Sequence, residues 1–267
     1  MTRALRVVLA AGGLLLWSAG GASAAAGLID VPHFEGLNPP HLLGYLARPT
    51  GTRRFPAVVI LHGCNGFSGS QVETAERLRN WGYVALAIDS AGSRGITAGC
   101  GASVGQIFDA HAALHYLSQQ DFVDPSRVAV LGYSMGADAA LRLAQNDGVP
   151  SEFEERFRAA VAYFPGCDAE SGAMGFPTMI LIGAADDWTP ADACRELQER
   201  TRNAGTPIDL TVYPGVYHGF TSTQAKPGFR NNLGHWIEYD QPAAKDAEAK
   251  IRAFLATHLA VVSPLPR

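Results

Sequence analysis

The chain has 267 residues, which is enough for one large α/β domain with a sizeable core or for two small domains. Its formal net charge is −4 and it contains no basic block, so a nucleic acid is not an expected partner. Glycine is abundant at 29 residues, which suits a fold with many tight turns between strands and helices.

The first 24 residues differ in kind from the rest. Two arginines precede an apolar run that ends at Trp17, and small residues follow up to Ala24. This is the pattern of a signal peptide cleaved after Ala24, because the apolar run is too short for a comfortable membrane span. We expect residues 1–24 to be a signal peptide and residues 25–267 to form an exported domain, periplasmic or secreted, without a membrane span. The alternative is an uncleaved anchor or an apolar N-terminal helix.

Apolar runs and helical spacings alternate along the rest of the chain. An irregular arm is expected first and an edge strand next, at 25–41 and 42–48. Buried strands are expected at 56–61, 83–88, 128–131, 159–164, 178–182 and 208–213. Helices are expected at 70–81, 104–119, 137–144, 191–203 and 242–259, with a polar loop at 221–241 and a frayed tail at 261–267. This alternation predicts a single α/β domain with a mostly parallel central sheet and helices on both faces.

The segment Gly132-Tyr133-Ser134-Met135-Gly136 matches the pattern G-x-S-x-G between a predicted strand and a predicted helix. In that context the serine stands on a cramped turn, with its hydroxyl exposed at the carboxyl edge of the sheet. The pattern alone recurs by chance in glycine-rich chains. Its placement between a strand and a helix favours Ser134 as a nucleophile.

A serine hydroxyl needs a base within hydrogen-bond reach, and the base needs a group that fixes its tautomer. His218 follows the last predicted strand in a glycine-flanked loop, which makes it the preferred base among the eight histidines. Asp186 and Asp187 follow the strand that ends at Ile182, and both remain candidates for the orienting acid.

Ser, Asp and His in this chain order are typical of α/β-hydrolases. Several blocks resemble, in order, those of the dienelactone hydrolase family, over roughly residues 40–258: Ile60–Gly66, Asp89-Ser90 with Arg94-Gly95, Gly132–Gly136, Asp186–Pro190 and His218–Phe220. The glycine-to-aspartate spacing in the acid loop of the superfamily favours Asp186 over Asp187. The founding members of the family use cysteine as nucleophile, whereas this chain has Ser134, which points to general carboxylester hydrolysis rather than to dienelactone.

The backbone N–H groups of Met135 and Cys64 are the expected oxyanion-hole donors. We interpret His62 as a side chain that holds the loop rather than as a catalyst. Trp188 and Phe220 flank the acid and the base, where they would line an acyl or alcohol pocket or serve only packing. The resemblance implies that Arg94 binds a substrate carboxylate; a solvated surface arginine is the alternative.

Four cysteines in an exported chain allow two disulfides. We favour the pairs Cys167–Cys194 and Cys64–Cys100, with buried free thiols as the alternative. The cysteines and histidines have no zinc-site spacing, so a structural metal is not expected.

These observations predict a hydrolase that cleaves carboxylic esters of small molecules through an acyl-enzyme, without a cofactor. Polyester, peptide or thioester bonds are alternative substrates of the same three side chains. A non-catalytic binding module on this scaffold is the alternative outside enzymes. The sequence leaves the natural ester and the oligomeric state open.

Overall fold

The computed structural model describes residues 25–96, 100, 105–148, 153–168, 173–202, 204, 206 and 208–260. A central eight-stranded sheet has the order β1-β2-β4-β3-β5-β6-β7-β8. Neighbours from β4 to β8 are parallel, and β1 and β2 join antiparallel at one edge. The strands are β1 (Ala25–Pro32), β2 (His41–Arg48), β3 (Phe55–Leu61), β4 (Val84–Asp89), β5 (Val123–Tyr133), β6 (Ala159–Tyr163), β7 (Thr178–Gly183) and β8 (Ile208–Tyr213).

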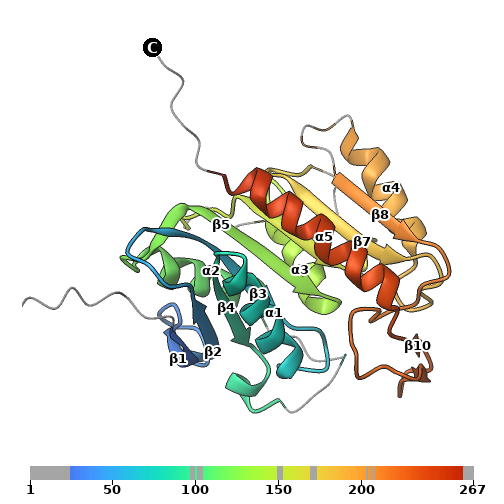
Figure 1. The fold of residues 1–267 in the computed structure, drawn as a ribbon, viewed down its shortest axis with the longest axis horizontal. Coiled ribbons are helices and arrows are strands. Elements are labelled where there is room, and N and C mark those ends of the chain that lie inside the picture. The colour runs from blue at the N-terminus through green and yellow to red at the C-terminus, as the bar shows by residue number, and fades with distance from the viewer. Residues whose placement is uncertain are drawn as a thin grey trace, which may run out of the picture.

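Helices cover both faces of this sheet (Figure 1). Helices α1 and α5 lie on one face, where Arg77 of α1 and Glu248 of α5 form an ion pair, and α2 and α3 cover the other. The helical elements are α1 (Gly69–Asn80), η1 (Gly92–Arg94), α2 (Gln106–Ser118), α3 (Met135–Ala144), α4 (Ala191–Arg202) and α5 (Gln241–His258). The predicted α/β fold with a mostly parallel sheet is therefore confirmed.

The central strands are buried on both faces because helices cover both. Every residue of β3, β6 and β7 is buried, which explains their near-continuous apolar sequences. The sheet thereby forms the core, and the loops at its carboxyl edge carry the polar side chains considered below.

The expected irregular arm at 25–41 is wrong for its first half. Residues Ala25–Pro32 form the edge strand β1, which pairs antiparallel with β2 from Ala25↔Arg48 to Pro32↔His41. This strand was not recognised because most of it is exposed or half-buried, and Val31 is its one buried residue. Pairing with β2, rather than an apolar pattern, makes Ala25–Pro32 a strand. The edge strand of the sheet is therefore β1 and not, as had been expected, β2.

The predicted polar loop at 221–241 contains a short hairpin, β9 (Phe229–Arg230) with β10 (Trp236–Ile237). Ile237 also forms an isolated parallel bridge with His218. The hairpin is thus attached to a loop at the carboxyl edge of the sheet. Within the described residues, no helix is long and apolar enough to cross a membrane.

Candidate active site

Ser134 stands at the junction of β5 and α3 in a strained conformation. Its φ is 50° and its ψ is −119°, which few residues other than glycine adopt. A Cβ on Gly132 would lie 1.9 Å from the Gly136 carbonyl oxygen, and one on Gly136 would lie 2.6 Å from the Leu61 carbonyl oxygen. Both glycines of the motif are therefore required by close backbone contact, as the sharp turn demands.

His218 lies between Ser134 and Asp186. Its Nε2 is 3.1 Å from the Ser134 Oγ, and its Nδ1 is 2.8 Å from the Asp186 Oδ2. The imidazole is 3% exposed and Asp186 is 4% exposed. Because the carboxylate only accepts, the Nδ1 proton faces Asp186 and Nε2 is free to accept the serine proton.

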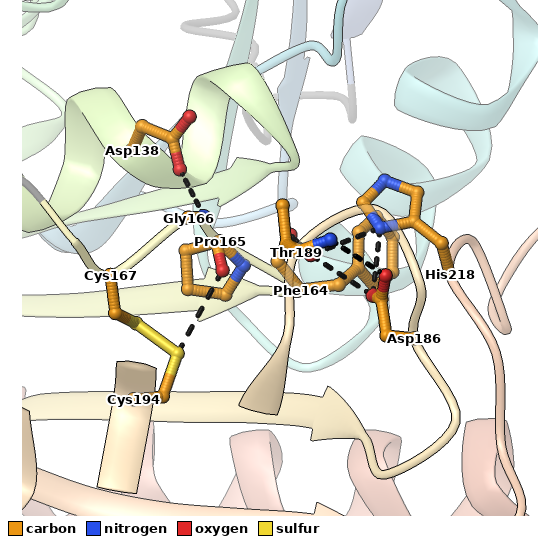
Figure 2. The surroundings of a disulfide bond; sticks show 9 residues. All are labelled: Asp138, Phe164, Pro165, Gly166, Cys167, Asp186, Thr189, Cys194 and His218. Carbon is orange, nitrogen blue, oxygen red and sulfur yellow. Dashed lines mark hydrogen bonds and ion pairs between the residues drawn. A yellow bond between two sulfur atoms is a disulfide. The ribbon is translucent and has the colours of Figure 1, made fainter. Parts of the chain in front are cut away.

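Asp186 is oriented by its own loop (Figure 2). Its Oδ1 accepts hydrogen bonds from the N–H groups of Trp188 (3.0 Å) and Thr189 (2.9 Å), and its Oδ2 accepts one from the Thr189 hydroxyl at 3.0 Å. Asp187 points elsewhere: it is exposed and accepts the Trp236 N–H at 3.0 Å. Of the two candidates, the structure brings Asp186 to His218, and Asp187 holds the hairpin.

The loop after β3 lies against Ser134. A Cβ on Gly63 would be 3.4 Å from the Ser134 Cβ, so this backbone passes close to the serine. The loop thus brings the Cys64 peptide to the same side of the molecule as the Met135 N–H, which directly follows Ser134. Both N–H groups remain candidates for contact with an oxyanion at Ser134.

His62 is fully buried and controls the orientation of that loop. Its Nε2 accepts the Ala91 N–H at 3.2 Å, so the ring proton is on Nδ1, which donates to the Gly63 carbonyl at 2.7 Å. The Gly63 carbonyl and the Cys64 N–H belong to one planar trans peptide and point in opposite directions. His62 thus sets the direction of the Cys64 N–H, while burial lowers the pKa of the imidazole and keeps it neutral.

The three residues expected to contact substrate have different surroundings. Trp188 is half-buried, 4.8 Å from the His218 ring and stacked on His235 at 5.2 Å, so it borders the group formed by Ser134, His218 and Asp186. Phe220 is 0% exposed and packs among core aromatic rings, which is the packing alternative of the expectation. Its large apolar ring is used for packing beneath the loop.

Arg94 is directed into the protein. It donates two hydrogen bonds, of 2.9 and 2.8 Å, to the carboxylate of Asp109, which is fully buried, and a third to the Ser90 carbonyl. Its guanidinium is thus committed to neutralising a buried charge. Because the guanidinium is paired with Asp109, the arrangement favours neither a substrate-binding nor a freely solvated arginine. The sequence alone did not indicate this structural partner.

Both expected disulfides are present. Cys64 pairs with Cys100, beside the loop after β3, and Cys167 pairs with Cys194, which joins the loop after β6 to α4. Such bonds are typical of proteins that fold in an oxidising compartment. The expected signal peptide lies outside the described residues.

Two residues beside the histidine escaped the sequence analysis. The Thr189 hydroxyl lies 3.2 Å from the His218 Nδ1, and the Phe164 ring meets the imidazole edge-on at 4.7 Å. Thr189 stands three residues after Asp186, a spacing that allows a local turn closed by the carboxylate. Phe164 follows β6 and carried no comparable signal.

Comparison with known proteins identifies the family. The sequence profile of the dienelactone hydrolase family matches residues 42–259. The chain is 25% identical over 209 residues to the "Probable 2-oxo-3-(5-oxofuran-2-ylidene)propanoate lactonase" of Bradyrhizobium sp., covering 69% of this chain and 81% of the relative. It is 31% identical over 148 residues to the quorum-quenching protein AidA of Acinetobacter baumannii, of which it spans 46%.

Solved structures share the fold. Esterase 2 of Thermogutta terrifontis, phosphorylated by paraoxon, superposes with a TM-score of 0.67 at 20% identity, over 90% of this chain and 96% of that one. The dienelactone hydrolase-like promiscuous phosphotriesterase P91, from metagenomic libraries, gives 0.68 at 20% identity, over 88% and 99%. Because the family profile spans most of the sequence and the fold agrees, this chain belongs to the dienelactone hydrolase family, a family of hydrolases.

Proposed function

We propose that this protein is a serine hydrolase that cleaves carboxylic esters of small molecules. The observation that carries the proposal is the continuous hydrogen-bonded series from the Ser134 Oγ through His218 to Asp186, with separations of 3.1 and 2.8 Å. The Bradyrhizobium relative is described as a lactonase, and a lactone is a cyclic carboxylic ester. Attack by a serine on a carboxylic ester therefore accounts for the cleavage of open-chain esters and of lactones alike.

In the proposed reaction, His218 Nε2 takes the Ser134 proton as Oγ attacks the ester carbonyl carbon. The oxyanion forms between the N–H groups of Cys64 and Met135, and Asp186 stabilises the imidazolium. Collapse of the tetrahedral intermediate breaks the bond to the alcohol oxygen, which leaves with the proton from His218. Water, deprotonated by His218, then attacks the acyl-enzyme and releases the acid and Ser134.

Two measurements test the proposal. Ser134→Ala lowers kcat for p-nitrophenyl acetate by roughly 10,000-fold or more, while the exposed-serine control Ser126→Ala keeps full activity. A fluorophosphonate probe labels the wild type at Ser134. Absence of both turnover and labelling in a folded wild type would instead favour a non-catalytic binding module.

Trp188 is proposed to contact the alcohol half of the ester. The leaving oxygen must approach His218 Nε2 to take up a proton, and the Trp188 ring lies 4.8 Å from that imidazole. We expect Trp188→Ala to lower kcat/KM for 2-naphthyl acetate, relative to methyl acetate, by roughly three- to tenfold. The ratio of methyl butyrate to methyl acetate is the control for the acyl half and stays constant.

We also propose that the protein is exported after cleavage at Ala24. The leader pattern and the two disulfides support this compartment. Intact-mass measurement of protein from the periplasm or medium tests it: a mature chain starting at Ala25 with no free thiol is expected. Retention of residues 1–24 on a membrane-bound protein would refute it.

A further inference from the structure

The turn after β6, residues 164–167, packs directly against the acid–base pair (Figure 2). Phe164 has a φ of +43°, in the left-handed region, which is costly for a bulky residue. Its ring lies against His218, and its carbonyl oxygen lies 3.2 Å from the Thr189 hydroxyl, which can donate its one proton either to this carbonyl or to Asp186 Oδ2. A shift of this turn would therefore move the support of the imidazole.

Two anchors hold the turn in this conformation. Asp138, in the first turn of α3, accepts the Gly166 N–H on its Oδ1 at 2.6 Å. At the end of the turn, the disulfide from Cys167 to Cys194 fixes it to α4 (Figure 2). The first anchor thus connects the helix that begins beside Ser134 with the turn that supports His218.

Gly166 lies in ordinary van der Waals contact with the side chains of Asp138 and Thr189. A Cβ on Gly166 would lie 3.6 Å from the Asp138 Oδ1 and 3.8 Å from the Thr189 Cγ2, so the turn is packed between these side chains. Burial raises the pKa of Asp138 to about 6, although the Gly166 hydrogen bond and the charge of His218 oppose the shift.

We propose that Asp138 is a positioning residue for ester hydrolysis: its carboxylate oxygen, by holding the Gly166 N–H, keeps the 164–167 turn where Phe164 and Thr189 support His218. The inference rests on the proposed roles of Ser134, His218 and Asp186. The proposed role requires that the side chain at position 138 place an acceptor oxygen within hydrogen-bond distance of the Gly166 N–H; it does not require a negative charge. Misplacing a reacting group by about 1 Å can cost up to about 100-fold in rate.

Three substitutions separate the acceptor from the charge. Asp138→Asn keeps an acceptor oxygen in place without the charge, so kcat for p-nitrophenyl acetate stays within about threefold of wild type. Asp138→Glu keeps the charge but displaces the oxygen, and Asp138→Ala removes it; both lower kcat by roughly 10- to 100-fold with little change in KM. Asp192→Ala, at an exposed aspartate in the first turn of α4, is the matched control and stays unchanged.

The second anchor provides an independent test. Cys167→Ala with Cys194→Ala loosens the other end of the turn, so its effect on kcat combined with Asp138→Ala departs from the product of the separate effects. A glutamate variant more active than the asparagine variant, or an alanine variant that folds and keeps wild-type kcat, overturns the proposal. If the alanine variant does not fold, the asparagine and glutamate pair still decides. If the fluorophosphonate probe does not label Ser134 in the wild type, the proposed function is refuted instead.

Discussion

His62 offers the most direct test of how the proposed oxyanion site is built. His62→Leu removes the Nδ1–H donor to the Gly63 carbonyl and the Nε2 acceptor of the Ala91 N–H. The peptide that carries the Cys64 N–H then loses its fixed direction. Removing one oxyanion donor completely costs about 100- to 1,000-fold in kcat. Because the peptide remains and still samples the productive orientation, we expect a loss of roughly 10- to 100-fold, with KM nearly unchanged.

His62→Asn is the informative companion, since its amide nitrogen replaces the Nδ1 donor and recovers most of the loss. The matched control is His111→Leu, at a buried histidine of α2 that stacks on Phe153. The assay is kcat and KM for p-nitrophenyl acetate, together with Ki for a phenylboronic acid, whose tetrahedral adduct occupies the same donors. A folded leucine variant with wild-type kcat, or Ki unchanged while kcat falls, would refute the reasoning.

Three further outcomes follow from burial and charge. Burial raises the folded-state pKa of Asp138 to about 6 from an ordinary 3.8, so its ionised form destabilises the protein above pH 6, and this cost vanishes as the pH falls to about 4. Asp138→Asn should therefore raise the free energy of unfolding, measured by urea denaturation, by up to about 3 kcal/mol at pH 7.5 and by almost nothing at pH 4. An equal gain at both pH values would contradict the raised pKa. Phe220→Ala lowers that free energy by about 3–5 kcal/mol without changing the ranking of esters, and a changed ranking with unchanged stability would return Phe220 to the substrate pocket. Arg94→Leu leaves the buried Asp109 without its guanidinium partner and with only His33 nearby at 3.3 Å, which costs about 3–5 kcal/mol. A selective rise in KM for acidic esters, with stability intact, would show that Arg94 binds substrate.

Much of the site was predictable because it follows strand ends. The loops after β5, β7 and β8 carry Ser134, Asp186 and His218, and the carboxyl ends of parallel strands meet at one edge of the sheet. The strand pattern and the chain order of these residues were therefore sufficient to bring them together in prediction. Related reasoning placed the two cysteine pairs: Cys64–Cys100 was expected to join two loops of that edge, and Cys167–Cys194 to join a strand-end loop to the start of a nearby helix.

What escaped prediction depended on partners distant in sequence. Asp109, fifteen residues after Arg94, takes up its guanidinium, and Phe220 is enclosed by rings from several strands. Strand β1 owes its conformation to pairing with β2 rather than to its own apolar pattern.

Local sequence, through apolar periodicity and the glycines that a sharp turn requires, determined the α/β architecture and the candidate residues of this protein. Only the tertiary structure decided which atoms those residues bind: that Asp186 rather than Asp187 faces His218, that His62 directs the Cys64 N–H, and that Asp138 holds the Gly166 turn. The physical reason is that periodicity reports which face of an element is buried, whereas a hydrogen bond requires two groups from separate segments to meet within about 3 Å.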